Sequence, residues 1–107
     1  MTGQALVRVP PRARAGEVIE ITAMARHPME TGFRTGPDGR LVPRDIVHTF
    51  SCRYDGVEVF RAALFPAITA NPYLAFTTVA TRSGTLEFRW DDDRGGSIVA
   101  TASIVVE

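Results

Sequence analysis

Few side chains in this sequence could do chemistry: one cysteine, two histidines and a run of three aspartates. Cys52 would need a neighbouring base to act as a nucleophile, and the nearest histidine along the chain is His48. Apolar alternation predicts a strand here, and at about 3.3 Å per residue four strand positions separate the two side chains by roughly 13 Å. They therefore cannot form a catalytic dyad. Because Cys52 alternates with Phe50 and Tyr54, we expect Cys52 in the core and His48, on the same face, in the core or at its rim.

The aspartate run is the one clustered set of potential metal ligands in the sequence. The spacing Asp91-x-Asp93-x-Gly95 is similar to the start of a calcium-binding EF-hand loop. The pattern fails because Gly95 replaces an oxygen ligand and Ala102 stands where a bidentate glutamate is required. The other candidate ligands are scattered along the chain: His27, Glu30 and His48. We expect a charged hairpin turn and no metal site.

No other motif indicates catalysis or cofactor binding. No serine lies in a Gly-x-Ser-x-Gly elbow, and no glycine-rich phosphate loop precedes a helical segment. The chain has 12 basic and 12 acidic residues, whereas nucleic-acid modules carry a strong basic excess. No apolar run approaches the length of a membrane span. The sequence therefore predicts a protein that is not an enzyme and that binds no cofactor, no nucleic acid and no membrane.

The elements that must position these residues are strands. Segments rich in β-branched and aromatic residues alternate with Gly, Pro, Asn and Asp, which is typical of an all-β chain. Seven strands are predicted, at residues 5–9, 18–24, 46–54, 57–64, 74–80, 85–90 and 98–106. Seven short strands in 107 residues, with no helical periodicity, indicate an immunoglobulin-like β-sandwich of about seven antiparallel strands. We expect one domain over residues 1–107.

Two connections carry specific signals. Asp55-Gly56 predicts a two-residue turn that joins the third and fourth strands in a hairpin. Residues 26–44 lose all periodicity, and Asp38-Gly39 within them predicts a ribbon bent back on itself. A loop of this length in a compact domain is functional or disordered. Its apolar and charged side chains favour function: Met29, Glu30, Phe33 and Arg34.

Binding is the function that these observations leave open. The long loop and the connection at residues 66–72 can present Phe33, Phe65 and Tyr73 to a partner. His27 lies in the loop, where it is a candidate for partner contact or a pH response, and equally for a solvated loop histidine.

Two irregular strings in the sequence are similar to segments of the SoxZ family, which belongs to a thiosulfate-oxidising multienzyme system. They are His27-Pro28-Met29-Glu30-Thr31-Gly32-Phe33-Arg34 and Asn71-Pro72-Tyr73-Leu74-Ala75-Phe76. Further matches, in order, are Gly39, Pro43, Ile46, Phe50, Tyr54-Asp55-Gly56, Val59-Phe60, Pro66-Ala67-Ile68 and Trp90-Asp91-Asp92-Asp93. The resemblance runs from about residue 5 to the C-terminus.

This resemblance implies that the chain is the non-catalytic subunit of the SoxYZ sulfur carrier. In that family the partner, SoxY, carries substrate sulfur on a cysteine of a flexible, glycine-rich C-terminal arm, and other Sox enzymes act on the adduct. The sequence here ends within a predicted strand and has no such arm, so we expect the scaffold subunit. The resemblance further implies transient contact with other Sox enzymes, and we expect a homodimer when the chain is isolated.

Location and contact residues follow from the same resemblance. The first residues lack a signal-peptide pattern, and we expect export to the periplasm together with a signal-bearing partner. The residues expected to bind SoxY or to shape the place where its arm docks are His27, Met29, Glu30, Gly32, Arg34, Asn71, Pro72 and Tyr73. The alternative for these positions is structural, since Asn and Pro often fix a corner and Gly serves backbone geometry. The alternative function is a stand-alone ligand- or protein-binding β-sandwich module.

Overall fold

The computed structural model describes residues 4–66 and 70–107, which form strands and, within these ranges, no helix. The strands are β1 (Ala5–Arg8), β2 (Arg12–Ala13), β3 (Val18–Ala25), β4 (Val47–Tyr54), β5 (Val57–Ala63), β6 (Tyr73–Val79), β7 (Gly84–Asp92) and β8 (Ser97–Val106). All seven predicted strands are present, with ends shifted by one or two residues, and β2 is an addition. The expected family match at Ala67 and Ile68 lies outside the described residues.

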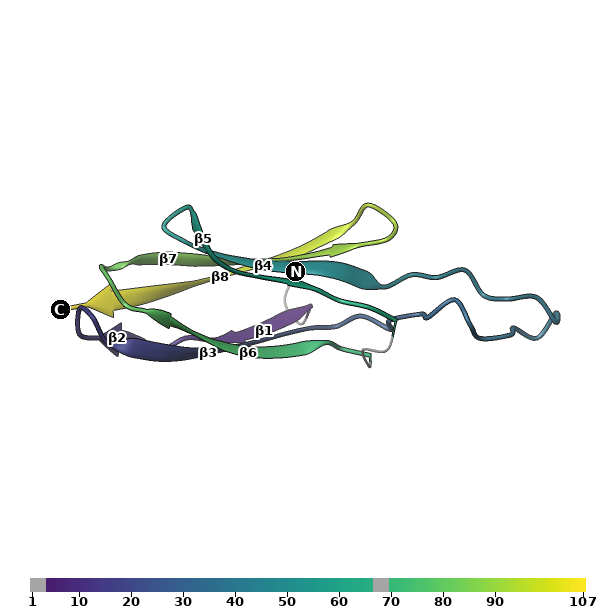
Figure 1. The fold of residues 1–107 in the computed structure, drawn as a ribbon, viewed down its shortest axis with the longest axis horizontal. Helices are drawn as coiled ribbons and strands as arrows, with labels where there is room; N and C mark the ends of the chain where they lie inside the picture. The colour runs from purple at the N-terminus through teal and green to yellow at the C-terminus, as the bar shows by residue number, and fades with distance from the viewer. Residues whose placement is uncertain (1–3, 67–69) are drawn as a thin grey trace.

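The strands form two sheets that face each other in two layers (Figure 1). One sheet has the order β1-β3-β6 and the other the order β2-β8-β7-β4-β5. The predicted all-β sandwich is therefore confirmed. One pairing departs from the prediction, because β2 runs parallel to β8, with Arg12 opposite Val105 and Ala13 opposite Val106. Pro10-Pro11 cannot donate to a ladder, so β1 ends there and the chain moves to the edge of the other sheet.

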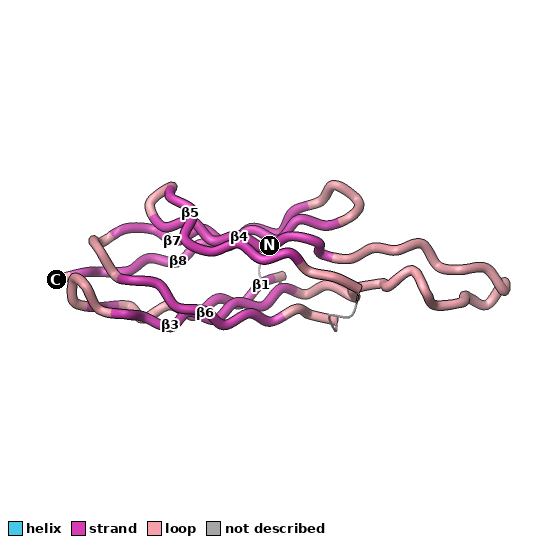
Figure 2. Tube along the Cα trace, viewed as in Figure 1, coloured by secondary structure: helices cyan, strands magenta, loops and turns pink. Residues whose placement is uncertain are grey.

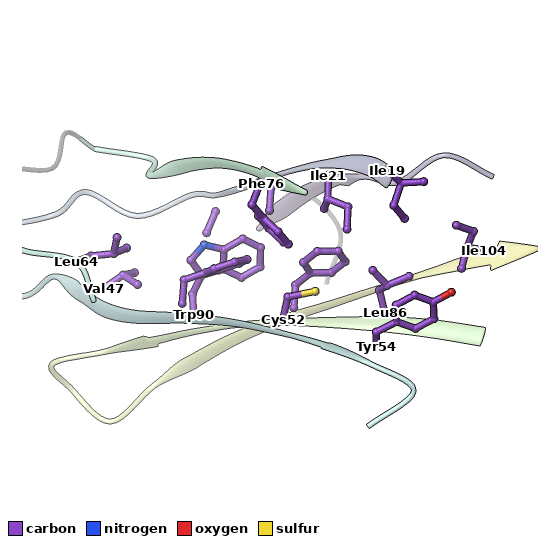
Figure 3. Packing of buried hydrophobic residues seen from close by; sticks show 14 of the residues in the cluster. Ile19, Ile21, Val47, Cys52, Tyr54, Leu64, Phe76, Leu86, Trp90 and Ile104 are labelled. Atoms are coloured by element: carbon purple, nitrogen blue, oxygen red, sulfur yellow. The ribbon is translucent and has the colours of Figure 1, made fainter. Parts of the chain in front are cut away.

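Aromatic side chains fill the space between the sheets. The fully buried ring of Phe50 is central, and its centroid lies 5.0 Å from that of Trp90 and 5.9 Å from that of Phe76. Phe60 of β5 stacks on Phe76 of β6 at 4.3 Å, which joins the two sheets along one side. Cys52 also lies between the sheets (Figure 3), as the alternation predicted.

The predicted hairpin at Asp55-Gly56 is confirmed. Tyr54 pairs with Val57, and φ is +50° at Asp55 and +80° at Gly56. Positive φ at both central residues is what a tight type I′ turn requires, and glycine and aspartate tolerate it best.

The long loop leaves the sandwich as a two-stranded excursion, which gives the molecule its 58 Å length (Figures 1 and 2). We call residues 30–45 the ribbon. Its two arms meet in isolated bridges, Glu30 with Asp45 and Thr35 with Leu41, and the chain turns back at Gly36 to Gly39. The prediction of a ribbon bent back on itself is therefore confirmed.

Candidate partner-binding site at the base of the ribbon

The two segments that resemble the SoxZ family, residues 27–34 and 71–76, meet where the ribbon leaves the sandwich. His27 follows β3, and its backbone N–H donates to Asn71 Oδ1 at 3.0 Å. The N–H of Asn71 donates in return to the carbonyl of His27 at 2.7 Å. Asn71 has φ of +56°, a left-handed conformation that asparagine tolerates better than most residues. The corner before β6 is thereby fixed to the base of the ribbon.

The ring of His27 is 8% exposed and has a defined orientation. Its Nδ1 accepts a hydrogen bond from the N–H of Met29 at 3.0 Å, so in the neutral ring the proton sits on Nε2. Nε2 lies 3.8 Å from Asp45 Oδ1 and 3.9 Å from Asp92 Oδ2. The buried Asp45 Oδ1 has no hydrogen-bond partner among the described residues. The ring thus presents its N–H side to two carboxylates at the ribbon base.

The donor atoms of His27, Asp45 and Asp92 lie within 4.8 Å of one another, a spacing that could hold a cation. A ligating histidine uses the lone pair of one ring nitrogen and donates from the other. In His27 the backbone N–H of Met29 occupies the Nδ1 lone pair, which leaves the proton on the nitrogen that faces the carboxylates. The geometry therefore suits a hydrogen-bearing Nε2 between acids and disfavours metal ligation.

The ribbon is attached to β4 by a second set of contacts. Met29, with φ of +53°, is buried, and its Sδ accepts the N–H of Val47 at 3.2 Å. Glu30 and Asp45 exchange backbone hydrogen bonds of 2.8 Å in both directions. The Glu30 carboxylate pairs with Arg34 at 2.7 Å, and this hydrogen bond lowers the pKa of Glu30. The Glu30–Asp45 pair joins the two arms at the start of the ribbon, and the Met29–Val47 hydrogen bond attaches this end to β4.

The acidic run attaches the other arm. The Asp93 carboxylate accepts hydrogen bonds from Arg44 at 2.8 and 2.9 Å and from the N–H of Ile46 at 3.1 Å. Burial opposes the ionisation of Asp93, yet these hydrogen bonds hold its pKa below the ordinary value. Asp92 accepts the N–H groups of Arg94 and Gly96 within the β7–β8 turn. The predicted charged hairpin turn is confirmed, and its Asp93 also braces the ribbon.

Gly32 has a conformational requirement of its own. Its φ is +88°, and a Cβ built there would lie 3.0 Å from Cβ of Arg44 on the opposite arm. A side chain would therefore be strained and would push the arms apart.

Burial divides the residues expected to contact SoxY. His27, Met29 and Pro72 are buried within the chain, so they shape the site and do not offer a surface themselves. Tyr73 is 64% exposed, and the side chain of Arg34 is 60% exposed. Contact with a partner remains a prediction for the exposed members.

The structure changes the interpretation of His48. The prediction that His48 shares the core face with Phe50 is wrong, because the β4–β7 register shifts between Val47 and Thr49. Val47 is buried in its place, and His48 is exposed with its Nδ1 2.8 Å from Thr49 Oγ1. A bulge of this kind leaves no signal in an alternating pattern.

Sequence reasoning also missed two features. It did not group His27 with Asp45 and Asp92, because the three come from separate segments that only the fold brings together. It named Phe33, which is 79% exposed on the ribbon, but missed Leu41 on the other arm, which is 65% exposed. A large apolar residue after the Asp38-Gly39 turn was the signal available.

Fold and site together define a class of protein. Two facing sheets enclose the chain's one thiol, and burial raises the pKa of Cys52 to about 12, so this sulfur is neither ionised nor accessible. The described side chains assemble a braced ribbon and no nucleophile with a base. The molecule is an immunoglobulin-like β-sandwich with a protruding ribbon.

The chain belongs to the SoxZ family: the model of this family, described as sulphur oxidation protein SoxZ, matches residues 7–103. It is therefore a component of the Sox sulfur-oxidation system, in a family of non-catalytic subunits. No curated protein gives a significant sequence match. The described residues contain no helix of the length and apolar character needed to cross a membrane.

Solved structures share the fold at low sequence identity. A superoxide reductase (neelaredoxin) from Ignicoccus hospitalis is 20% identical with a TM-score of 0.75, and the match covers 97% of this chain and 80% of that one. The sulfur carrier protein SoxY from Chlorobium limicola f thiosulfatophilum is 13% identical with a TM-score of 0.69, over 99% of this chain and 81% of that one. At these identities the likeness shows the fold alone.

Proposed function

We propose that this chain is the scaffold subunit of a heterodimeric SoxYZ carrier. In that complex the sulfur intermediates are bound to a cysteine of SoxY, and this chain supports their presentation to the Sox enzymes. The observation that carries the proposal is the complete burial of Cys52. A SoxZ family member whose one thiol is sealed between two sheets needs a partner to supply the sulfur-binding group.

The thiol of a sulfur carrier must be both accessible and able to ionise. A thiol forms bonds to sulfur compounds as the thiolate, and it must be reachable by each enzyme in turn. Cys52 is 0% exposed in mid-strand, and its raised pKa keeps it protonated at neutral pH. Bond formation and cleavage then take place on the partner, and this chain contributes binding surface and shelter.

Partner and location form part of the same proposal. A solved SoxY protein has the same fold, so the heterodimer would join two sandwiches of one kind. Other Sox enzymes would contact this chain transiently while they act on the SoxY arm. The complex would work in the periplasm after export with the signal-bearing SoxY.

The stand-alone binding module gains no support from the described residues. A sugar- or ligand-binding platform needs exposed aromatic side chains on one face. Trp90 is 1% exposed and Tyr54 is 5% exposed, and the exposed aromatic residues Phe33, Phe65 and Tyr73 come from three separate segments of the chain.

The test is reconstitution. The chain is co-expressed with SoxY, the complex is isolated by gel filtration, and thiosulfate oxidation is measured in a reconstituted Sox system with and without the chain. We expect a one-to-one complex that turnover requires. Absence of a complex, or full turnover without this chain, would contradict the scaffold role.

A further inference from the structure

Each sheet ends in strands whose outer backbone groups have no ladder partner among the described residues. Among the described strands, β1 and β6 lie at the edges of one sheet and β2 and β5 at the edges of the other. Free edges invite pairing with another chain, and proteins protect them with short strands, proline, charge or bulges. The four edges can therefore be compared for protection.

Three of the edges are protected. Strand β1 has four residues and is followed by Pro10-Pro11, and β2 has only two residues. Strand β5 carries the exposed ion pair between Glu58 and Arg61, at 2.8 Å. The β4–β5 register also shifts between Cys52 and Arg53, which twists this edge.

Strand β6 has none of these protections. Its seven residues, Tyr73–Val79, include no charge, no proline and no glycine. They pair with β3 in seven consecutive register positions without a bulge. An edge of this length, regular and uncharged, is a template for an additional strand.

Two hydrogen bonds at the ends of β6 show which groups face outward. The N–H of Ala25 donates to the carbonyl of Pro72 at 3.3 Å, and the N–H of Ala80 donates to the carbonyl of Glu17 at 2.8 Å. Hydrogen-bonded pairs alternate along an antiparallel ladder, so the pairs with β3 fall on every second residue between these ends. The residues whose N–H and C=O point away from β3 are Tyr73, Ala75, Thr77 and Val79, all of them exposed.

The seam beside this edge is also open. A groove of about 490 Å³ lies between β5 and β6, lined by Val57 and Val59 on one side and by Thr77 and Val79 on the other. Its walls are mainly apolar, and a strand added to β6 would lie beside it and cover part of it. The unpaired edge of β6 and the apolar groove beside it together favour the binding of a partner strand over exposure to water.

We propose that β6 is the edge through which this chain pairs with SoxY, whose sandwich adds an uncharged strand antiparallel to Tyr73–Val79. The inference rests on the proposed function and adds the place of contact. SoxY is the favoured occupant because a solved member shares this fold and so ends in the same kinds of edge strand. Two sandwiches of one fold that join through equivalent edges are related by a pseudo-two-fold axis, which makes the paired strands antiparallel. Apolar or β-branched partners opposite Tyr73 and Val79 suit this ladder.

Residue-level hydrogen exchange tests the proposal on the unmodified proteins. The labelled chain is measured alone and in complex with SoxY by NMR. We expect the amides of Tyr73, Ala75, Thr77 and Val79 to exchange rapidly in the dilute chain alone and at least about tenfold more slowly in the complex. The amides of the intervening residues, which bond to β3, are slow in both states and serve as the internal control.

Each other outcome has a distinct meaning. A complex that leaves the four amides unprotected overturns edge pairing while the scaffold role stands. Absence of any complex overturns the proposed function and this inference with it. Protection that appears without SoxY, rises with chain concentration and is kept in preference to a one-to-one complex when SoxY is added assigns the edge to a second copy, which overturns SoxY as its occupant.

A matched pair of substitutions gives a second test. Ala75→Pro removes an outward N–H of β6 and leaves the hydrogen bonds to β3 in place, since edge strands tolerate proline at such positions. Ala63→Pro makes the same change on β5, where Leu64 bonds to His48 and the N–H of Ala63 faces outward. We expect Ala75→Pro to weaken SoxY binding at least about tenfold and Ala63→Pro to leave it unchanged, with circular dichroism as the check on folding. Equal binding by two folded variants would overturn the proposal.

Discussion

The sandwich and the ribbon of this chain are held together by different forces. The sandwich encloses aromatic and aliphatic side chains in a single cluster around Phe50. The ribbon has no such core, and its base is held by hydrogen bonds and ion pairs from His27, Asp93 and Arg44. The hydrophobic effect that stabilises the sandwich does not depend on the orientation of the groups it buries. A hydrogen bond or ion pair at the ribbon base, in contrast, is lost when either of its two partners is removed. We therefore expect the ribbon to loosen under conditions in which the sandwich stays folded.

The largest effect is expected from the core. Phe50→Ala removes a fully buried ring that contacts four aromatic neighbours, and such a change costs about 3–5 kcal/mol of unfolding free energy. Urea denaturation of the purified chain measures it. Val99→Ala, at a half-exposed position on β8, is the control and should stay within about 0.5 kcal/mol. A similar loss in both variants would contradict the assignment of the core.

A smaller and more local effect is expected at the ribbon base. His27→Ala removes the acceptor of the Met29 N–H and the ring that faces the carboxylates of Asp45 and Asp92. We expect this change to lower the stability of the ribbon base by about 1–3 kcal/mol. Hydrogen exchange should quicken in residues 29–46 while the core strands keep their protection. His48→Ala is the matched control, because His48 is exposed. Uniform loss of protection across the molecule would mean that ribbon and sandwich form one cooperative unit.

The smallest effect is expected from acid. The pKa of Asp93 is lowered in the folded chain, so its contribution is present above the unfolded pKa and is lost as the pH falls through the folded pKa. The ribbon base should therefore loosen below about pH 4, near the ordinary pKa of aspartate. Chemical shifts of Arg44 and Ile46, followed from pH 7 to pH 3, measure the change. In Asp93→Asn this step should disappear, and its persistence would assign the acid response to other carboxylates.

The same contrast explains how much of the molecule the sequence could predict. Strand positions, the Asp55-Gly56 hairpin and the burial of Cys52 follow from local alternation and turn chemistry, and all were predicted. The parallel pairing of β2 and the exposure of His48 were not, because a chain crossover and a bulge depend on the partner strands.

The sequence indicated which residues belong to the site but not how they contact one another. The two irregular strings were singled out, and the structure brings them together through His27 and Asn71. The burial of individual site residues depends on contacts between segments far apart in the chain. The same holds for the position of Asp45 and Asp92 beside the His27 ring. The open edge at β6 likewise emerges only when all four edges are known.

In the proposed carrier, sulfur is bound by the partner and never by Cys52. Intact-mass spectrometry of both subunits, taken during thiosulfate turnover in the reconstituted system, tests it most directly. We expect sulfur adducts on SoxY alone, an unmodified mass for this chain, and unchanged turnover in a Cys52→Ala variant. A sulfur adduct on Cys52, removed together with turnover by that substitution, would contradict it.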